Sequence, residues 1–285
     1  MGQLSKNFLF SLFICIVCSC GSDSDTNRIT DIELPADTQC PGTVAGATPT
    51  GNNDVLVWAD EFDTEGFPCR QNWDAEIGTG DWGWGNNEKQ YYTRSNAYAE
   101  NGILRITAKK EAYRGSEYTS ARIVTRDKFE FTYGRVEVRA KLPKGGGTWP
   151  AIWMLGSNIS SVGWPACGEI DIMEHKGNDL GYISSAIHNA SGYANTPYFN
   201  QQYKADVTDV FHVYGIEWNS SKIQFTVDGN VHYSYNPPFK NDNNWPFNKE
   251  HFIILNVAMG GTLGGNIDPN FTESAMEIDY VRVYQ

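Results

Sequence analysis

Short runs of apolar, β-branched and aromatic residues recur from Val55 to the end of the chain, separated by Gly, Asn, Asp and Pro. The run Arg135–Leu142 is the most regular: charged side chains at positions 135, 137, 139 and 141 alternate with apolar ones at 136, 138, 140 and 142. A period of two is typical of a strand with one face in the core and the other in water. This run therefore predicts a half-buried β-strand.

Similar runs predict further strands and no long helix. Asp228-Gly229-Asn230, between two of these runs, is a signal for a tight hairpin. The sequence shows no internal repeat, so we expect one all-β domain over residues 54–285, a β-sandwich or jelly roll. The further strands are expected at Val55–Phe62, Gly102–Ala108, Thr119–Thr125, Ala151–Leu155, Glu169–Glu174, Tyr182–His188, Val213–Trp218, Ile223–Val227, Val231–Tyr235, Phe252–Met259 and Glu277–Tyr284.

Charge limits the kinds of partner. The chain has 34 acidic and 22 basic side chains and a net charge of -12, and no basic cluster reverses this locally. Such a surface repels phosphate backbones, so we expect no nucleic-acid partner. Aromatic residues make up 13% of the chain and offer flat apolar faces, which suits a neutral ligand.

The N-terminal segment is expected to lie outside the domain. Lys6 and the apolar run Phe8–Cys18 predict a signal peptide over residues 1–19, since a membrane span needs about 20 apolar residues. Val17-Cys18-Ser19-Cys20 resembles the lipobox of bacterial lipoproteins, which implies lipidation of Cys20. The acidic tract Gly21–Asp25 resembles signals that send such lipoproteins to the cell exterior. We expect an exported outer-membrane lipoprotein, held to a membrane only by its lipid anchor, with plain secretion as the alternative.

Residues 20–53 are rich in Ser, Asp, Thr, Gly, Pro and Asn, which predicts a flexible tether. Beyond Cys20 the chain keeps Cys40, Cys69 and Cys167. An oxidising compartment permits a disulfide, and Cys40 and Cys69, which flank the first predicted strand, are the candidates. Cys167 is expected to be a small buried residue.

The segment Glu169–His175 carries the most informative pattern. On a regular strand Glu169 and Asp171 share one face, while Ile170 and Ile172 share the other. Regular alternation would then bury Glu174 in the core, which costs several kcal/mol for a group without a partner, on the order of 2–7 even when it is neutral. One extra residue in a β-bulge removes this conflict and returns Glu174 to the acidic face. We therefore predict a bulge at Ile172–Met173.

Three crowded carboxylates repel one another, so at least one should be protonated near neutral pH. Glycoside hydrolysis needs an ionised carboxylate beside a protonated carboxyl. The alternative is a solvated sheet face that carries acids by chance. No HExxH pattern or Cys/His cluster indicates a catalytic metal, and no GxSxG elbow indicates a serine hydrolase.

Glu169-Ile170-Asp171-Ile172-Met173-Glu174 resembles the bulged E-x-D-x-x-E signature of glycoside hydrolase family 16, in its laminarinase form. Four other segments are similar to that family and in the same order, so the resemblance covers about residues 55–285. They are Trp84–Glu88 with Gln90–Thr93, Thr119–Arg122, Thr148–Leu155 and Ile278–Tyr284. The resemblance implies a concanavalin A-like jelly roll with a concave substrate cleft, a β-glucan substrate, and no cofactor for catalysis. We also expect a monomer.

The resemblance also implies roles for single residues. Glu169 would be the nucleophile, Glu174 the acid/base of a retaining reaction, and Asp171 their assistant. Trp153 could instead belong to the core, and His188 could be structural. The implied substrate-binding residues are Trp82, Asn86, Arg122, Trp149, Trp153 and His188.

Members of the family often hold a structural calcium ion. The positions implied here are Glu61, the carbonyl of Gly102, and Asp279, which are oxygen ligands of the kind that calcium prefers. Glu61 and Asp279 could instead be ordinary surface charges.

The bulged form favours an endo-1,3-β-glucanase acting on laminarin. Mixed-linkage β-1,3-1,4-glucanases and other family 16 polysaccharidases share this form, so they remain alternatives. A non-catalytic glycan-binding surface protein would use the same aromatic residues but has no need of three crowded acids.

Overall fold

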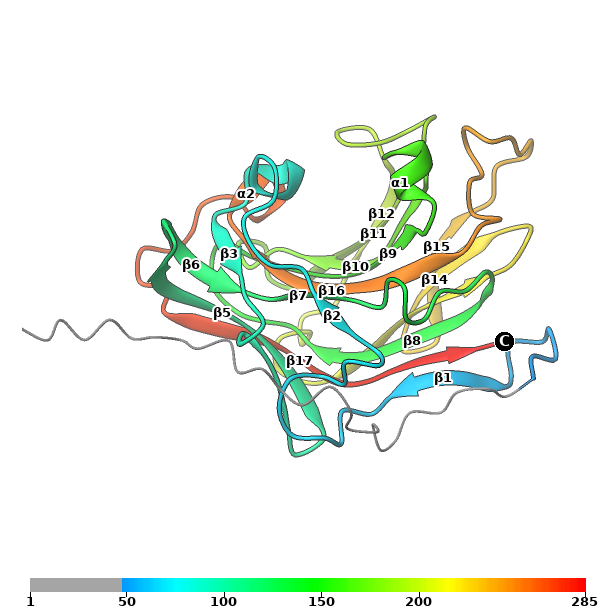
Figure 1. Cartoon of the computed structure of the whole chain (residues 1–285). Coiled ribbons are helices and arrows are strands. Elements are labelled where there is room, and N and C mark those ends of the chain that lie inside the picture. The colour runs from blue at the N-terminus through cyan, green and yellow to red at the C-terminus, as the bar shows by residue number, and fades with distance from the viewer. Residues whose placement is uncertain (1–47) are drawn as a thin grey trace, which may run out of the picture. The chain divides into compact units, whose positions relative to one another are not determined.

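The computed structural model describes residues 48–285, which fold into two packed β-sheets (Figure 1). No helix in this part of the chain has both the length and the apolar character needed to span a bilayer. The predicted signal peptide, most of the predicted tether, Cys20 and Cys40 lie outside the described residues. The all-β fold expected from the strand pattern is confirmed.

The larger sheet has ten strands. Its pairings are antiparallel except for that of β3 with β6. Two short strands extend it, since β1 pairs with β17 and β4 pairs with β5. In order across the sheet the strands are β15 (Asn230–Tyr235), β14 (Ile223–Val227), β13 (His212–Trp218), β8 (Gly134–Lys141), β17 (Glu273–Tyr284), β5 (Ile103–Tyr113), β6 (Ser116–Ser120) and β3 (Gln90–Tyr92), with β1 at Leu56–Asp60 and β4 at Ala97–Glu100.

The smaller sheet has seven antiparallel strands and curves across the larger one. We call its side that points away from the larger sheet the concave face. Three short helical turns lie above this face, η1 (Gly83–Asn87) and α2 (Gly261–Gly264) on one side and α1 (Ile159–Val162) on the other (Figure 1). The strand order is β12 (Tyr198–Tyr203), β11 (Tyr182–His188), β10 (Glu169–His175), β9 (Thr148–Gly156), β16 (His251–Met259), β7 (Arg122–Val124) and β2 (Asp74–Ala75).

The main core lies between the two sheets and follows the predicted alternation. On β8, Val136, Val138 and Ala140 are fully buried, while the charged residues between them face outward. The hairpin at Asp228-Gly229-Asn230 is also confirmed, because Val227 pairs with Asn230 and both Asp228 and Gly229 have positive φ.

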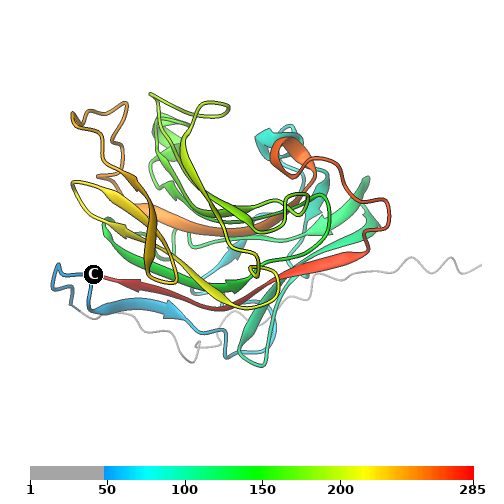
Figure 2. The same cartoon turned by 180° about the vertical axis from the view of Figure 1, so that it is seen from behind.

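The prediction of a single strand over Thr119–Thr125 is wrong. The chain forms β6 in the larger sheet and β7 in the smaller sheet, and only Ala121 lies between them. Every residue from Thr119 to Thr125 except Arg122 is buried, whichever sheet it belongs to, so no change of pattern in the sequence reveals the switch. The sequence did not predict four of the strands, β2, β3, β4 and β12. Figure 2 shows the two sheets from behind.

Candidate active site

A β-bulge in β10 brings three carboxylates to the concave face. The register with β11 shifts between Asp171 and Glu174, and the register with β9 shifts between Asp171 and Met173. Ile172 and Met173 both enter the main core as a result. The bulge predicted at Ile172–Met173 is confirmed, and Glu174 returns to the side of Glu169 and Asp171.

Glu169 and Asp171 share a histidine from the neighbouring strand. Nε2 of His188 on β11 lies 3.2 Å from Oδ2 of Asp171 and 3.7 Å from Oε1 of Glu169. His188 lies opposite Glu169 in the sheet, so the two side chains point to the same face. This places His188 among the acids on the concave face rather than in the main core.

Two tryptophans donate hydrogen bonds to the outer members of the acidic group. Trp149 Nε1 lies 3.0 Å from Oε1 of Glu174, and Trp164 Nε1 lies 2.8 Å from Oε2 of Glu169. Trp164 was not singled out from the sequence. It lies in the loop between β9 and β10, where no alternation indicates the direction of a side chain.

Burial and the neighbouring charges separate the proton affinities of these groups. Burial raises the pKa of Glu174 to about 7, although the positive charge of His188 and the hydrogen bond from Trp149 act in the opposite direction. Burial, reinforced by the charge of Glu169, also raises the pKa of Asp171 well above its ordinary value. Burial alone would lower the pKa of His188, but its contact with Asp171 and the three nearby carboxylates outweigh burial and raise it to about 9.

These proton affinities suit acid–base chemistry. One donor atom each from Glu169, Asp171 and His188 lie within 4.8 Å of one another, a spacing that a metal ion could use. The pKa of His188, raised to about 9, favours a protonated imidazole that is paired with these carboxylates. Glu174 can donate a proton near pH 7, as the general acid of a glycosidase must.

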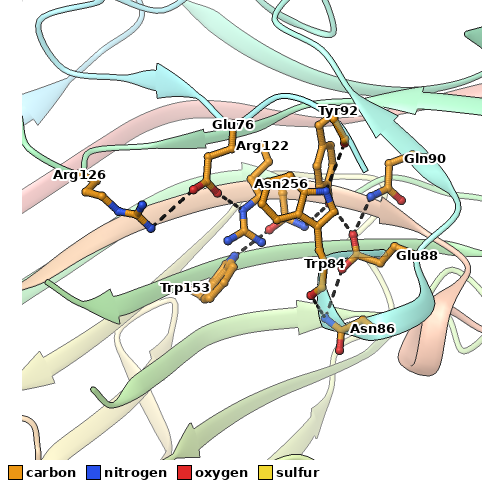
Figure 3. A network of polar contacts seen from close by, with 11 residues as sticks. Glu76, Trp84, Asn86, Glu88, Gln90, Tyr92, Arg122, Arg126, Trp153 and Asn256 are labelled. Atoms are coloured by element: carbon orange, nitrogen blue, oxygen red, sulfur yellow. Dashed lines mark hydrogen bonds and ion pairs between the residues drawn. The ribbon is translucent and has the colours of Figure 1, made fainter. Parts of the chain in front are cut away.

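Beside the carboxylates, Trp153 and Arg122 form a second part of the concave face (Figure 3). Trp153 lies opposite Asp171, so its ring stands on the concave face and not in the main core, and its Nε1 donates to Asn256 at 2.7 Å. The guanidinium of Arg122 lies 4.7 Å from the ring of Trp153 and 4.6 Å from that of Trp84. Glu76 accepts a hydrogen bond from Arg122. Arg122 therefore holds the two rings, and its role as a direct sugar ligand stays a prediction.

Asn86 and Glu88 approach this region from η1 and the residue after it. Glu88 is largely buried and accepts hydrogen bonds from Asn86, Gln90 and Tyr92. Burial raises the pKa of Glu88 although these donors oppose it. Tyr92 in turn accepts a hydrogen bond from Asn256, which links this network to Trp153 (Figure 3). Trp82 precedes η1 and 68% of its surface is exposed, so its ring is accessible for the substrate contact that the resemblance implies.

The predicted calcium ligands are engaged with arginines. Glu61 accepts hydrogen bonds of 2.7 and 2.9 Å from Arg282, and Asp279 is paired with Arg139. A divalent ion at these side chains would have to displace two guanidinium groups, so the arrangement fits calcium poorly. The backbone at Gly102 has a positive φ, and this residue follows β4.

The structure describes two of the cysteines, Cys69 and Cys167. Cys69 is disulfide-bonded, whereas its proposed partner Cys40 lies outside the described residues, so the pairing stays a prediction. Cys167 is a free and buried thiol, and burial raises its pKa to about 11. It is therefore a packing residue, as predicted, and not a nucleophile.

Comparisons with known proteins agree with this geometry. The model of the glycosyl hydrolases family 16 matches residues 84–282. A β-glucanase of Rhodothermus marinus is 43% identical over 248 residues, which cover 81% of this chain and 85% of that protein. The crystal structure of a laminarinase from Flavobacterium sp. UMI-01 is 44% identical, with a TM-score of 0.77, over 81% of this chain and 100% of that one.

A third comparison includes sugars. A LamA variant of Z. galactanivorans, in complex with laminaritriose and laminaritetraose, is 41% identical with a TM-score of 0.73, over 81% of this chain and 99% of that chain. The acidic strand, the jelly-roll sandwich and these matches together show that the chain is a glycoside hydrolase and belongs to the glycosyl hydrolases family 16.

Proposed function

We propose that the protein is an endo-acting, retaining β-glucanase that hydrolyses internal β-1,3-glucosidic bonds of laminarin-type glucans. The observation that carries the proposal is the bulge of β10, which sets Glu169, Asp171 and Glu174 on one concave face beside Trp149 and Trp153. The names of the relatives support the choice of glucan.

The residues would act in two displacements. Glu169 attacks the anomeric carbon while Glu174 gives its proton to the departing glycosidic oxygen, so the C–O bond breaks and a glycosyl ester of Glu169 forms. Glu174 then takes a proton from water as the water oxygen attacks the anomeric carbon and releases Glu169. Asp171 and His188 adjust the charge around Glu169, and Trp164 holds one of its oxygens.

The first experiment measures release of reducing sugar from laminarin. Glu169→Gln should abolish release and retain polysaccharide binding, because the amide keeps the shape of the side chain but cannot form the ester. A matched substitution outside the concave face, Tyr98→Ala, should leave release unchanged. Unchanged release by Glu169→Gln would contradict the role of this residue. The anomeric form of the first product, followed by NMR, tests retention.

Linkage preference needs a separate measurement. Laminarin, lichenan, agarose and carrageenan are digested side by side, and the products are separated by chromatography. We expect laminarin to be cut fastest. Preferred cleavage of lichenan would indicate a mixed-linkage enzyme, and preferred cleavage of a galactan would indicate another polysaccharidase of the family.

We further propose that the mature protein begins at lipidated Cys20 and faces the cell exterior. The lipobox-like sequence before Cys20 and the acidic tract after it support this. Labelling of cells with a fatty-acid analogue should mark the wild type but not Cys20→Ser. Protease added to intact cells should degrade the protein, and an unlabelled, freely secreted wild type would contradict the anchor. We also expect the catalytic domain to be a monomer, which sedimentation tests.

Bound calcium at Glu61, Gly102 and Asp279 stays a prediction, and the arginine pairs weigh against it. If the ion binds, calcium should raise the melting temperature of the wild type, and Asp279→Ala should abolish that rise. An identical melting temperature with calcium and with chelator would remove the site from consideration.

A further inference from the structure

The concave face continues past the carboxylates onto β11 and β12. Asp171 lies opposite Ala186 on β11, and Ala186 lies opposite Phe199 on β12. Side chains that oppose each other in a sheet point to the same face, so Phe199 stands on the concave face in line with Asp171. Neighbouring strands are about 4.8 Å apart, which places the backbone of Phe199 roughly 10 Å from that of Asp171.

The same face of β12 is aromatic and open to solvent. Phe199 is 56% exposed and Tyr203 is 60% exposed, and Gln201 between them is exposed as well. Tyr203 lies opposite Tyr182 of β11, and the two rings have centroids 5.0 Å apart.

The other face of β12 is used for attachment. The side chain of Asn200 donates a hydrogen bond of 2.8 Å to the backbone oxygen of His232 on β15. Asn200 therefore ties this edge strand to the larger sheet, whereas Phe199, Gln201 and Tyr203 point to the opposite, concave face. Figure 1 shows β12 at the end of the row β9, β10, β11, β12.

An exposed aromatic row on an edge strand invites association with other chains, so proteins normally avoid it unless a ligand uses it. The ligand of the proposed function is a glucan chain. The C–H faces of its pyranose rings pack on aromatic rings, and its hydroxyls can bond the amide of Gln201.

We propose that Phe199, supported by Gln201 and Tyr203, forms a sugar-binding subsite on the side of the cleaved bond opposite Trp153 and Arg122. The inference rests on the proposed function, since it assigns more of the same glucan chain. A pyranose ring that packs on Phe199 is not the sugar attacked by Glu169, because the backbones of β12 and β10 are about 10 Å apart. Only longer chains reach this subsite.

The experiment compares kcat/KM for laminari-oligosaccharides of increasing length. In the wild type, kcat/KM should rise when the chain becomes long enough to reach Phe199. Phe199→Ala should lose that rise, a reduction of roughly 3- to 10-fold for long chains only, which is the usual range for an aromatic contact. Phe199→Trp should keep it. Tyr98→Ala, an exposed aromatic on the larger sheet, should match the wild type at every length.

Two results would overturn the subsite. One is a length dependence of Phe199→Ala that runs parallel to that of the wild type. The other is a dimer of the wild type that Phe199→Ala converts to a monomer, which would make a second copy the occupant. Melting temperatures should agree among the variants because Phe199 is exposed. A wild type that cuts no β-1,3-glucan would instead refute the proposed function, and the subsite with it.

Discussion

Trp149 donates a hydrogen bond of 3.0 Å to Glu174 from the strand beside it. This bond favours the ionised form of the carboxyl, while burial favours the protonated form and prevails, leaving the pKa at about 7. Glu174 is thus poised between donor and acceptor at neutral pH, which a group that acts first as acid and then as base requires.

Replacing Trp149 with Phe should move the alkaline limb of the pH–activity profile to higher pH. The wild type should lose activity as pH rises through about 7, since Glu174 then loses the proton it donates. Without the hydrogen bond from Trp149 the ionised form of Glu174 is less stable, so the pKa of Glu174 should rise by up to about one unit. The profile of kcat/KM on laminarin measures this, and an alkaline limb that moves to lower pH would contradict the assignment.

Glu174→Ala should slow turnover by on the order of 100-fold on laminarin, whose leaving group needs a proton. The loss should be smaller for an aryl glycoside with a good leaving group, and added azide should restore part of that rate. The alkaline limb near pH 7 should vanish with the carboxyl. If the pH profile of the variant equals that of the wild type, another group is the acid.

His188 should link stability to pH. Its pKa is raised from 6.5 to about 9 in the folded protein, so its contribution is complete below pH 6.5 and disappears as pH rises through about 9. The free energy of unfolding of the wild type, relative to that of His188→Gln, should fall across this window by up to about 3 kcal/mol. Urea unfolding of both proteins at pH 6 and pH 9 measures the difference. A difference that grows with pH would have the wrong sign.

Deleting Met173 should convert β10 into a regular strand. Alternation would still send Glu174 to the concave face, but its distance from Glu169 would change, so we expect activity to fall by about 10-fold or more. Met173→Ala is the matched control, because it removes buried contacts but keeps the bulge. It should lose about 2–5 kcal/mol of stability and retain most of its activity. Full activity of the deletion would show that the bulge is dispensable.

The acidic strand was predictable because its pattern contains a conflict. Regular alternation from Glu169 to Glu174 would have buried a carboxylate, and only an extra residue resolves this. The apolar positions of β8 were also predictable because buried residues alternate with half-buried charged ones, and strand β16 was predictable because its residues form a continuous buried run.

Other parts of the site leave no such trace in the sequence. Trp164 reaches Glu169 from a loop, and Glu76 meets Arg122 across 46 residues of chain. Strand β12 has nearly all of its residues exposed, so it lacks the apolar alternation of a half-buried strand. Contacts made through the fold rather than along the chain could not be predicted from spacing alone.

The passage through Ala121 has a consequence for engineering. A single buried residue joins β6 to β7, so the chain passes from one sheet to the other with no spare residues. The distance between the two sheets therefore fixes the position of Arg122. An insertion beside Ala121 would displace Arg122 from the rings of Trp84 and Trp153 and would disturb both sheets. Directed evolution of linkage preference should therefore leave the length of this passage unchanged.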